Sequence, residues 1–173
     1  MDLGPVRYRT WENLSEYIWK VSCAVGLVSI RLFGCVDPKS EAYAVALGHA
    51  LQLTNIMRDV REDYENGARI YLPQEDLERF GYEEKDVAER CEDSRFQALM
   101  EVQAERALRY FREAAELMPE VDRKALLPAR IMGAVYESLL HAMIRDGFGV
   151  FRKRYKVSLL RKLWIVVRYG LLG

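Results

Sequence analysis

Apolar residues recur at helical spacing along most of the chain, and alternating strand patterns are scarce. Glycine and proline divide the sequence into blocks that predict helices over residues 10–33, 38–66, 93–118, 122–146 and 159–172. The stretch 68–81, which contains Pro73, is expected to connect the second helix to the third. We therefore predict an all-α fold with almost no strand.

The ends of these helices carry recognisable signals. Thr10 is placed to cap the first helix, and Asp37 followed by Pro38 is placed to open the second. Ser158 is placed to cap the last, and Pro128 predicts a bend within the helix before it. Glycines follow three of the predicted ends, at Gly34, Gly67 and Gly147.

One face of the second predicted helix carries polar side chains in register. With Gln52 at zero and about 100° per residue, Asn55 falls at roughly −60° and Asp59 at roughly −20°. Asp63 follows at roughly +20°, and Glu62 lies at the edge of the stripe, at roughly −80°. The stripe therefore combines two acids one turn apart with two carboxamides.

Apolar neighbours place this stripe beside the buried side of the helix. Leu53, Ile56 and Val60 border it, whereas a solvated face is more often rich in lysine and glutamate. Arg58 and Arg61 are expected to point elsewhere, at roughly −120° and 180°. These two arginines leave open an ordinary polar face held by ion pairs.

Carboxylates four residues apart lie about 6 Å from each other on one helix face. Asp59 and Asp63 are therefore placed to ligate Mg²⁺ jointly, because this ion prefers hard oxygens, waters and substrate phosphates. Gln52 and Asn55 can orient waters or phosphate oxygens without adding negative charge. The pattern favours a diphosphate site with Mg²⁺, or Mn²⁺ in its place.

Three segments closely resemble the squalene/phytoene synthase family. The run Leu51 to Asp63, followed by Gly67, Arg69 and Tyr71-Leu72-Pro73, resembles the family's second aspartate-rich motif. Tyr17 with Val21, Ala24, Val25 and Gly26 resembles its tyrosine-bearing helix, with Ser22-Cys23 where Ala-Gly is usual. Residues 128–136 and 147–154 resemble its late helix and basic segment, and 126–157 are most similar to hopanoid-pathway presqualene diphosphate synthases.

This resemblance covers nearly the whole chain and implies a fold. It implies an all-α, isoprenoid-synthase-type helical bundle whose C-terminal portion is residues 1–173. No Asp-x-x-x-Asp helix precedes Tyr17, so we expect the N-terminal helices with the first aspartate-rich motif to lie outside these residues. We expect this fragment to be inactive alone, and a separate N-terminal half is one explanation that stays open.

The resemblance also implies a reaction. It implies a prenyltransferase that joins two farnesyl diphosphates head to head into presqualene diphosphate and releases diphosphate. Asp59 and Asp63, helped by Gln52, Asn55 and Glu62, would hold Mg²⁺ against one diphosphate. A phytoene or dehydrosqualene synthase and a non-catalytic helical module stay open as alternatives.

Further residues receive roles from the same resemblance. Tyr17 would lie near the reacting carbons, stabilise a carbocation and relay a proton, with Ala24 and Val28 on its face leaving space for a prenyl chain. Tyr136 would line the pocket, although plain packing fits it as well.

Phosphate would be neutralised by basic side chains. The candidates are Arg69, Arg152, Lys153 and Arg154, and Arg58 ranks lower because it points away from the stripe. The run 152–154 also fits a simple surface run.

Composition narrows the remaining choices. Lys+Arg and Asp+Glu balance at 26 each, which gives no sign of a nucleic-acid partner. The three cysteines form no CxxC pair, and His49 and His141 lack metal-ligand spacing, so we expect no zinc site and no disulfide framework.

Targeting signals are the last point. We expect no signal peptide, and no apolar run approaches the roughly 20 residues of a membrane span. A cytoplasmic protein is therefore expected. The basic and apolar segment 159–169 either rests peripherally on the inner membrane face or packs on the bundle.

Overall fold

The computed structural model describes residues 6–172, so the outermost positions of the predicted domain (1–5 and 173) lie outside it. The described part is helical and contains no strand, apart from one isolated bridge between Arg7 and Ile70. The elements are α1 (Trp11–Ile18), the π-helical turn η1 (Trp19–Cys23), α2 (Ala24–Leu32), α3 (Lys39–Arg58), α4 (Val60–Glu65), α5 (Gln74–Arg79), α6 (Glu84–Ala88), α7 (Ser94–Leu117), the 3₁₀ turn η2 (Glu120–Asp122), α8 (Leu127–Arg145) and α9 (Leu159–Leu172). The all-α prediction is confirmed.

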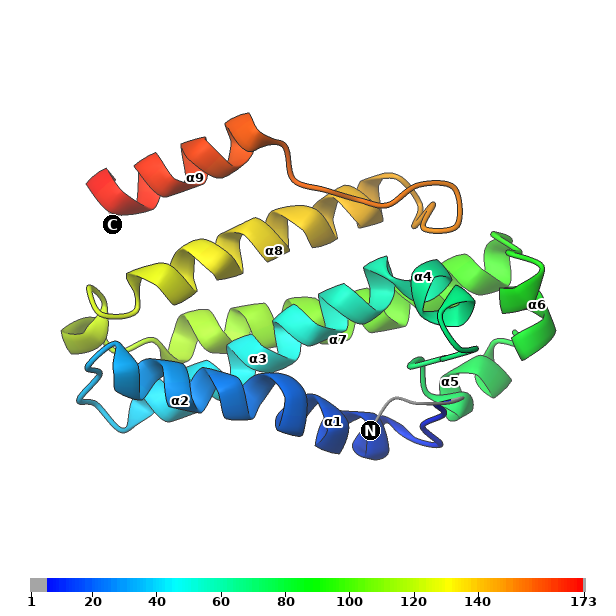
Figure 1. The fold of residues 1–173 in the computed structure, drawn as a ribbon, viewed down its shortest axis with the longest axis horizontal. Coiled ribbons are helices and arrows are strands. Elements are labelled where there is room, and N and C mark those ends of the chain that lie inside the picture. Colours follow the sequence, from blue (N-terminus) through cyan, green and yellow to red (C-terminus); the bar gives the residue numbers. More distant parts are fainter. Residues whose placement is uncertain (1–5, 173) are drawn as a thin grey trace.

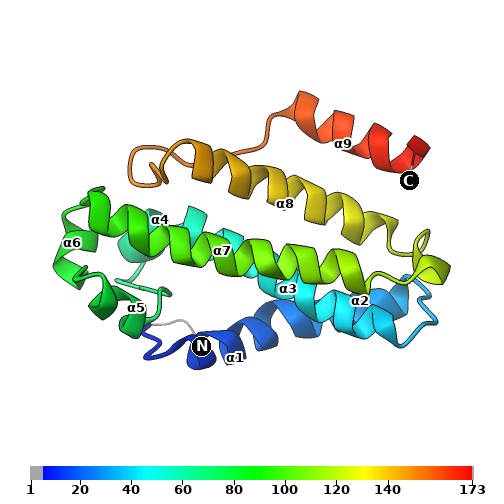
Figure 2. The ribbon, with the colours of Figure 1, turned by 180° about the vertical axis from the view of Figure 1, so that it is seen from behind.

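The long helices lie side by side with α3 at the centre (Figure 1). α3 packs against α7, against η1 and α2, and against α8. The view from behind shows the same order, with α9 outermost beside α8 and the short helices α4 to α6 gathered at one end (Figure 2). α3 therefore carries its polar stripe through the middle of the bundle.

Small residues let α3 and the helices of the N-terminal segment approach closely. A Cβ atom added at Gly48 would lie 3.0 Å from the Cα of Cys23, and one at Gly26 would lie 3.2 Å from the carbonyl oxygen of Ala44. Both spacings are tighter than ordinary van der Waals contact. Backbone contact thus fixes how α3 lies against η1 and α2.

Several helix boundaries follow the predicted signals. The Thr10 side chain accepts a hydrogen bond from the Asn13 amide, which confirms it as the cap of α1. The predicted helix over 122–146 instead begins at Leu127, because 120–122 form a 3₁₀ turn. Pro128 lies in the first turn of α8, where its missing N–H costs nothing, so the predicted bend is wrong.

Two predicted helices are interrupted. The first contains the π-helical turn η1, and the second breaks at Asp59, whose backbone has φ −101° and ψ 13°. The connecting stretch is also more regular than predicted, because the short helix α5 follows Pro73 within it. The π-helical turn shifts the side chains of α2 around the helix axis.

Candidate functional site

The predicted polar stripe borders a cavity of about 270 Å³. Gln52 and Asn55 reach it from α3, Asp59 from the break, and Asp63 from α4. The complete lining is Tyr17, Gln52, Asn55, Ile56, Arg58, Asp59, Asp63 and Tyr71, and we call this space the polar cavity. The structure thus brings together five of the predicted site residues.

The break at Asp59 keeps the two acids on one side. The Asp59 amide donates to the Asn55 carbonyl at 2.9 Å, and the Asp63 amide donates to the Asp59 carbonyl at 2.8 Å. These bonds retain the four-residue helical spacing, although the backbone dihedrals at Asp59 leave the α region. Arg58, the last residue of α3, nevertheless lines the cavity because its guanidinium group pairs with the adjacent Asp59 carboxylate, so its predicted outward direction is wrong.

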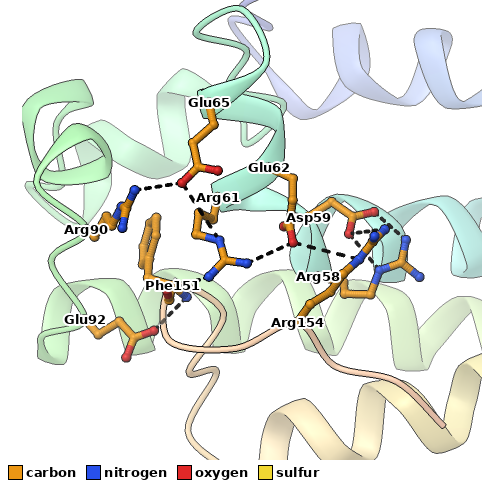
Figure 3. A network of polar contacts seen from close by, with 9 residues as sticks. All are labelled: Arg58, Asp59, Arg61, Glu62, Glu65, Arg90, Glu92, Phe151 and Arg154. Atoms are coloured by element: carbon orange, nitrogen blue, oxygen red, sulfur yellow. Dashed lines mark hydrogen bonds and ion pairs between the residues drawn. The ribbon is translucent and has the colours of Figure 1, made fainter.

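Asp59 is held between two guanidinium groups. The Arg58 Nε donates to Asp59 Oδ1 at 2.8 Å, and its Nη2 contacts Oδ2. Arg154 comes from the segment after α8 and places its Nη2 3.3 Å from Asp59 Oδ1 (Figure 3). The charge of this carboxylate is therefore balanced in the structure.

Glu62 lies beside this pair and takes part in a longer ionic chain (Figure 3). Its Oε1 is 3.1 Å from Arg61 Nη2 and 3.9 Å from Arg154 Nε. Arg61 also donates to the carbonyl of Phe151 at 3.1 Å, which ties α4 to the segment after α8. Glu62 itself does not line the polar cavity.

Three buried polar atoms have no hydrogen-bond partner among the described residues. They are Asn55 Oδ1, Glu62 Oε2 and Arg69 Nε. Native proteins rarely leave buried polar atoms unpaired, and such atoms indicate an absent water, ion or ligand. Two of the three are oxygens on the predicted metal-binding set.

Asp63 differs from Asp59 because less positive charge balances its carboxylate. Burial and then the neighbouring charge of Asp59 raise the pKa of Asp63 to about 6, while Arg69 acts in the opposite direction. The Arg69 amide donates to the Asp63 carbonyl at 3.1 Å, and the two residues line a small adjoining cavity. Arg69 therefore lies next to the polar cavity, though not in its lining.

Tyr17 is fixed by aromatic neighbours. Its ring centroid is 5.2 Å from that of Tyr8 and 5.3 Å from that of Tyr71. Tyr71 lines the polar cavity, yet sequence reasoning gave it no role. The available signal was its position directly after the aspartate-rich motif.

A second, mainly apolar cavity of about 420 Å³ lies between α2, α3 and α8. Asn55 lines both cavities, so they adjoin at this residue. Tyr136 lines the apolar cavity from α8, and its hydroxyl contributes to the raised pKa of Arg58, whose main cause is the hydrogen bond to Asp59. Tyr136 thus lies where the apolar and polar spaces meet.

The helix face that borders the apolar cavity differs from the predicted one. Val25, Gly26 and Ser29 line it, whereas Ala24 does not and Val28 is 62% exposed. The π-helical turn η1 inserts extra residues into one helical turn and shifts every later side chain around the axis. The prediction that Ala24 and Val28 share the face of Tyr17 is therefore wrong.

The basic run 152–154 divides into separate roles. Arg152 pairs with Glu92 at 2.9 Å and Lys153 with Asp146 at 2.8 Å, both away from the polar cavity. Only Arg154 of the three pairs with acids of the site.

His49 and the cysteines have structural surroundings. The His49 ring nitrogens lie 3.0 Å from Ser15 Oγ and 3.2 Å from Cys23 Sγ, and the ring stacks on Tyr110. The thiols of Cys23, Cys35 and Cys91 are free.

Comparison with known proteins decides the family. The family model for squalene/phytoene synthase matches residues 1–161. The chain belongs to this family. Family members are prenyltransferases, and the all-α fold and the aspartate-rich run agree with this assignment.

The relatives carry different activities. The 15-cis-phytoene synthase of Synechocystis sp. is 38% identical over 175 residues, covering 94% of this chain and 52% of that protein. The presqualene diphosphate synthase of Rhodopseudomonas palustris is 36% identical over 159 residues, covering 92% of this chain and 57% of that protein. The chain thus spans about half the length of these squalene/phytoene synthase relatives.

Comparison with solved structures supports the same family and fold. The squalene synthase HpnC from Alicyclobacillus acidocaldarius matches with a TM-score of 0.71 and 32% identity, covering 82% of this chain and 54% of that chain. A dehydrosqualene synthase in complex with ligand matches with a TM-score of 0.75 and 31% identity, covering 95% and 58%. The isoprenoid-synthase-type fold is confirmed.

Proposed function

We propose that this chain supplies the Asp59–Asp63 side of an active site that condenses two farnesyl diphosphates into presqualene diphosphate. The observation that carries the proposal is the pair of adjoining cavities joined at Asn55. The acidic one suits a metal-bound diphosphate, and the apolar one suits a hydrocarbon chain. One polar and one apolar cavity side by side therefore match the two ends of a prenyl diphosphate.

A divalent metal ion fits the residues of the polar cavity. Family enzymes generally use such ions for diphosphate substrates. Within residues 6–172, no group of three or more His, Cys, Asp or Glu side chains forms a metal site alone. The unpaired oxygens of Asn55 and Glu62, with the crowded carboxylates of Asp59 and Asp63, nevertheless form a hard-oxygen set typical of Mg²⁺ with phosphate and water. Mn²⁺ has the same ligand preference.

We propose that these four residues hold Mg²⁺, which would neutralise charge on the departing diphosphate. Gln52 lines the same cavity and would orient phosphate oxygens through its carboxamide. Arg69 and Arg154 would bind further oxygens, since guanidinium groups match phosphate geometry. Arg58 joins them because it lines the cavity.

The reaction breaks the C–O bond of one farnesyl diphosphate and releases diphosphate. Two new carbon–carbon bonds then close the cyclopropane of presqualene diphosphate, and one proton is lost. Tyr17 lines the polar cavity and would stabilise the cation through its ring face. Its hydroxyl would pass the lost proton to the released diphosphate.

An alternative is a phytoene or dehydrosqualene synthase. The phytoene synthase relative of Synechococcus elongatus is 39% identical over 175 residues, which is as close as the presqualene diphosphate synthases. A structural neighbour is a dehydrosqualene synthase. The length of the prenyl chain that the apolar cavity accepts would separate these activities.

The second alternative is a non-catalytic helical module. Under our proposal, the remainder of the domain, in the same or a separate polypeptide, covers the open side of the apolar cavity at α2. Val25 lines that cavity while 61% exposed, so this wall is open in residues 6–172. We also propose a cytoplasmic location, which the three free thiols support.

Binding to this chain provides the first test. Calorimetry with farnesyl thiodiphosphate, an analogue that resists ionisation, should show binding that requires Mg²⁺. Asp63→Asn should weaken it at least about tenfold, because a metal ligand loses its charge. Glu116→Gln, an exposed position on α7, is the matched control and should bind normally. Equal binding by all three proteins would contradict the metal site.

Product analysis provides the second test. The complete domain would be incubated with farnesyl diphosphate and, separately, with geranylgeranyl diphosphate. Presqualene diphosphate from the first substrate is the expected product. Accumulation of phytoene from the second would overturn the squalenoid assignment, and lack of any product would favour the non-catalytic module.

A further inference from the structure

The chain after α8 divides into two parts with different surroundings. Its last part, α9, packs against α8, and no helix within residues 6–172 is long and apolar enough to cross a membrane. Its first part, residues 147–157, has no regular helix or strand and folds back towards α4, and we call it the return segment. Four of its side chains are nevertheless buried: Phe148, Val150, Phe151 and Tyr155. The structure therefore fixes the path of this segment without regular backbone pairing.

Hydrogen bonds and ring packing hold the return segment together. The Gly149 amide donates to the Tyr155 hydroxyl at 3.0 Å, and that hydroxyl donates to the Asp146 carboxylate at the end of α8. The centroid of the Phe151 ring lies 5.1 Å from that of the Phe96 ring in α7. Phe151 is therefore held by packing as well as by the loop around it.

The peptide groups of Phe151 are bound by two other elements. Its amide donates to Glu92 Oε1 at 2.9 Å, and its carbonyl accepts from Arg61 Nη1 at 3.1 Å (Figure 3). Glu92 lies in the loop between α6 and α7, whereas Arg61 lies in α4. The other oxygen of Glu92 pairs with Arg152 Nη1 at 2.9 Å. Glu92 thus directs both carboxylate oxygens at the return segment, and its side chain is only 12% exposed.

Arg154 follows Phe151 by three residues and reaches the acids of the site. Its Nη2 lies 3.3 Å from Asp59 Oδ1 and its Nε 3.9 Å from Glu62 Oε1, while its side chain is 48% exposed. Ion pairs with such exposure hold a side chain weakly. Three residues extend to roughly 10 Å at most, so the position of Phe151 limits where the Arg154 backbone can lie. The direction of the guanidinium group therefore depends on how the return segment is fixed.

We propose that Glu92 is a positioning residue, which holds Arg154 at the polar cavity by fixing the peptide group of Phe151. Its effect on ligand binding rests on the proposed function, in which Arg154 binds diphosphate. Glu92 lines neither the polar nor the apolar cavity, so it would act without touching the ligand. A guanidinium group that is already in place loses less freedom when phosphate binds, and fixing it beforehand therefore raises affinity.

The length and the charge of the Glu92 side chain can be varied separately. Glu92→Asp keeps the charge but shortens the side chain by one methylene group, which removes the contact with the Phe151 amide. Glu92→Gln removes the charge but keeps the length, and its side-chain oxygen can still accept from that amide. Positioning through Phe151 requires the length, whereas an electrostatic effect on an anionic ligand would follow the charge.

Calorimetry of the whole chain with farnesyl thiodiphosphate and Mg²⁺ tests this role. We expect Glu92→Asp to weaken binding by about threefold to tenfold and Arg154→Ala by about tenfold or more, since charged hydrogen bonds are the strong ones in phosphate binding. Glu92→Gln should retain binding within about twofold of wild type. In the Arg154→Ala background, Glu92→Asp should change the affinity by less than about twofold, because the arginine through which Glu92 acts is absent.

Asp86→Asn is the matched control. Asp86 lies in the same part of the chain and has the same kinds of partner, the Glu83 amide at 2.7 Å and Arg95 Nη2 at 3.0 Å. Both partners lie outside the return segment, so this variant should bind as wild type does. Hydrogen–deuterium exchange of residues 148–157, measured without ligand, should be faster in Glu92→Asp and unchanged in Asp86→Asn.

Unchanged exchange in Glu92→Asp would overturn the inference, and so would equal losses of affinity in the presence and absence of Arg154. A loss in Glu92→Gln or Asp86→Asn as large as that in Glu92→Asp would also overturn it, because the cause would then be charge or general destabilisation. Failure of the wild type to bind would refute the proposed function instead. The exchange measurement alone would then decide whether Glu92 fixes the return segment.

Discussion

Asp59 and Asp63 have different electrostatic surroundings, although four residues separate them. Two guanidinium groups flank Asp59, while burial, and then the neighbouring charge of Asp59, raise the pKa of Asp63 to about 6. An extra cation beside both acids would lower the pKa of Asp63. Asp63, whose negative charge is the less balanced of the two, therefore faces the space where a metal ion fits.

Replacing either acid tests this arrangement. We expect Asp59→Asn or Asp63→Asn to abolish turnover in the complete domain, because each would remove a charged ligand of the proposed metal ion. Circular dichroism should show unchanged helicity, since both side chains face a cavity. Near-normal activity of either variant in Mg²⁺ would contradict the role of that carboxylate.

Tyr17→Phe tests the proposed role of the tyrosine. The ring, stacked between Tyr8 and Tyr71, should stay in place. We expect kcat to fall about 10²-fold or more with little change in KM, because the hydroxyl acts on the departing proton. A raised KM with unchanged kcat would show instead that Tyr17 only lines the site.

Single residues show how far the sequence could predict the site. The four-residue spacing predicted that Gln52, Asn55, Asp59 and Asp63 share one face, and they border one cavity. The direction of the Arg58 guanidinium group could not be predicted, because a helical wheel places only the start of a side chain, and this long side chain turns to pair with Asp59. Nor could the pairing of Arg154 with Asp59, which depends on how a distant segment folds back.

At the scale of the elements, the π-helical turn η1 decides which residues of α2 form the apolar cavity. The side chain of Ser22, within this turn, donates to the Gly48 carbonyl at 2.9 Å. Cys23 packs against Gly48 so closely that an added Cβ atom would lie only 3.0 Å from its Cα and Sγ atoms, so Cys23 would have to shift. The turn and the glycine thus determine each other's position.

We therefore expect Gly48→Ala to destabilise the protein by about 1–3 kcal/mol, as overpacking of a tight contact does. Urea denaturation would measure the change. Gly170→Ala in α9 is the control, because a Cβ there meets nothing within 4 Å and the alanine favours helix. Equal stability of the Gly48→Ala variant and wild type would show that η1 can shift without cost.

Helix boundaries were predictable where a local signal decides them. Thr10 and the Asp93 side chain, which accepts from the Arg95 and Phe96 amides, cap the helices that they precede. The π-helical turn and the break at Asp59 have no such signal, because tertiary contact and not local propensity selects them. Both lie in helices that border the cavities.

At the scale of the whole molecule, buried acids connect separate layers. Asp122 in η2 accepts from the Val36 amide at 3.0 Å, the Asp37 amide at 2.9 Å and the Ser40 hydroxyl at 2.7 Å. It thus joins the α2–α3 loop to the turn that precedes α8. Asp76 similarly holds α5 to α7 through Gln103 and Arg106.

The Asp122 contacts predict a pH dependence of stability. Hydrogen bonds from the Val36 amide, Ser40 and the Asp37 amide lower the pKa of Asp122 below its ordinary 3.8. The stabilisation is therefore complete above pH 3.8 and is lost as the pH falls through the lower folded value, because the unfolded state takes up the proton first.

We expect Asp122→Asn to lower the Tm by several degrees at pH 7. The difference from wild type should shrink below about pH 4, because the wild-type carboxylate then becomes protonated. Thermal unfolding followed by circular dichroism at several pH values would measure it. A difference that stays constant from pH 7 to pH 3 would show that Asp122 acts through packing alone.

The pair of arginines on Asp59 has a thermodynamic consequence for ligand uptake. A metal ion that binds Asp59 competes with Arg58 and Arg154, so the ion alone should bind weakly. Diphosphate offers the displaced guanidinium groups a new partner, and each ligand therefore raises the affinity for the other. Under the proposed function, metal ion and diphosphate substrate therefore bind cooperatively. Before they bind, the two arginines balance the charge of Asp59 in place of a metal ion.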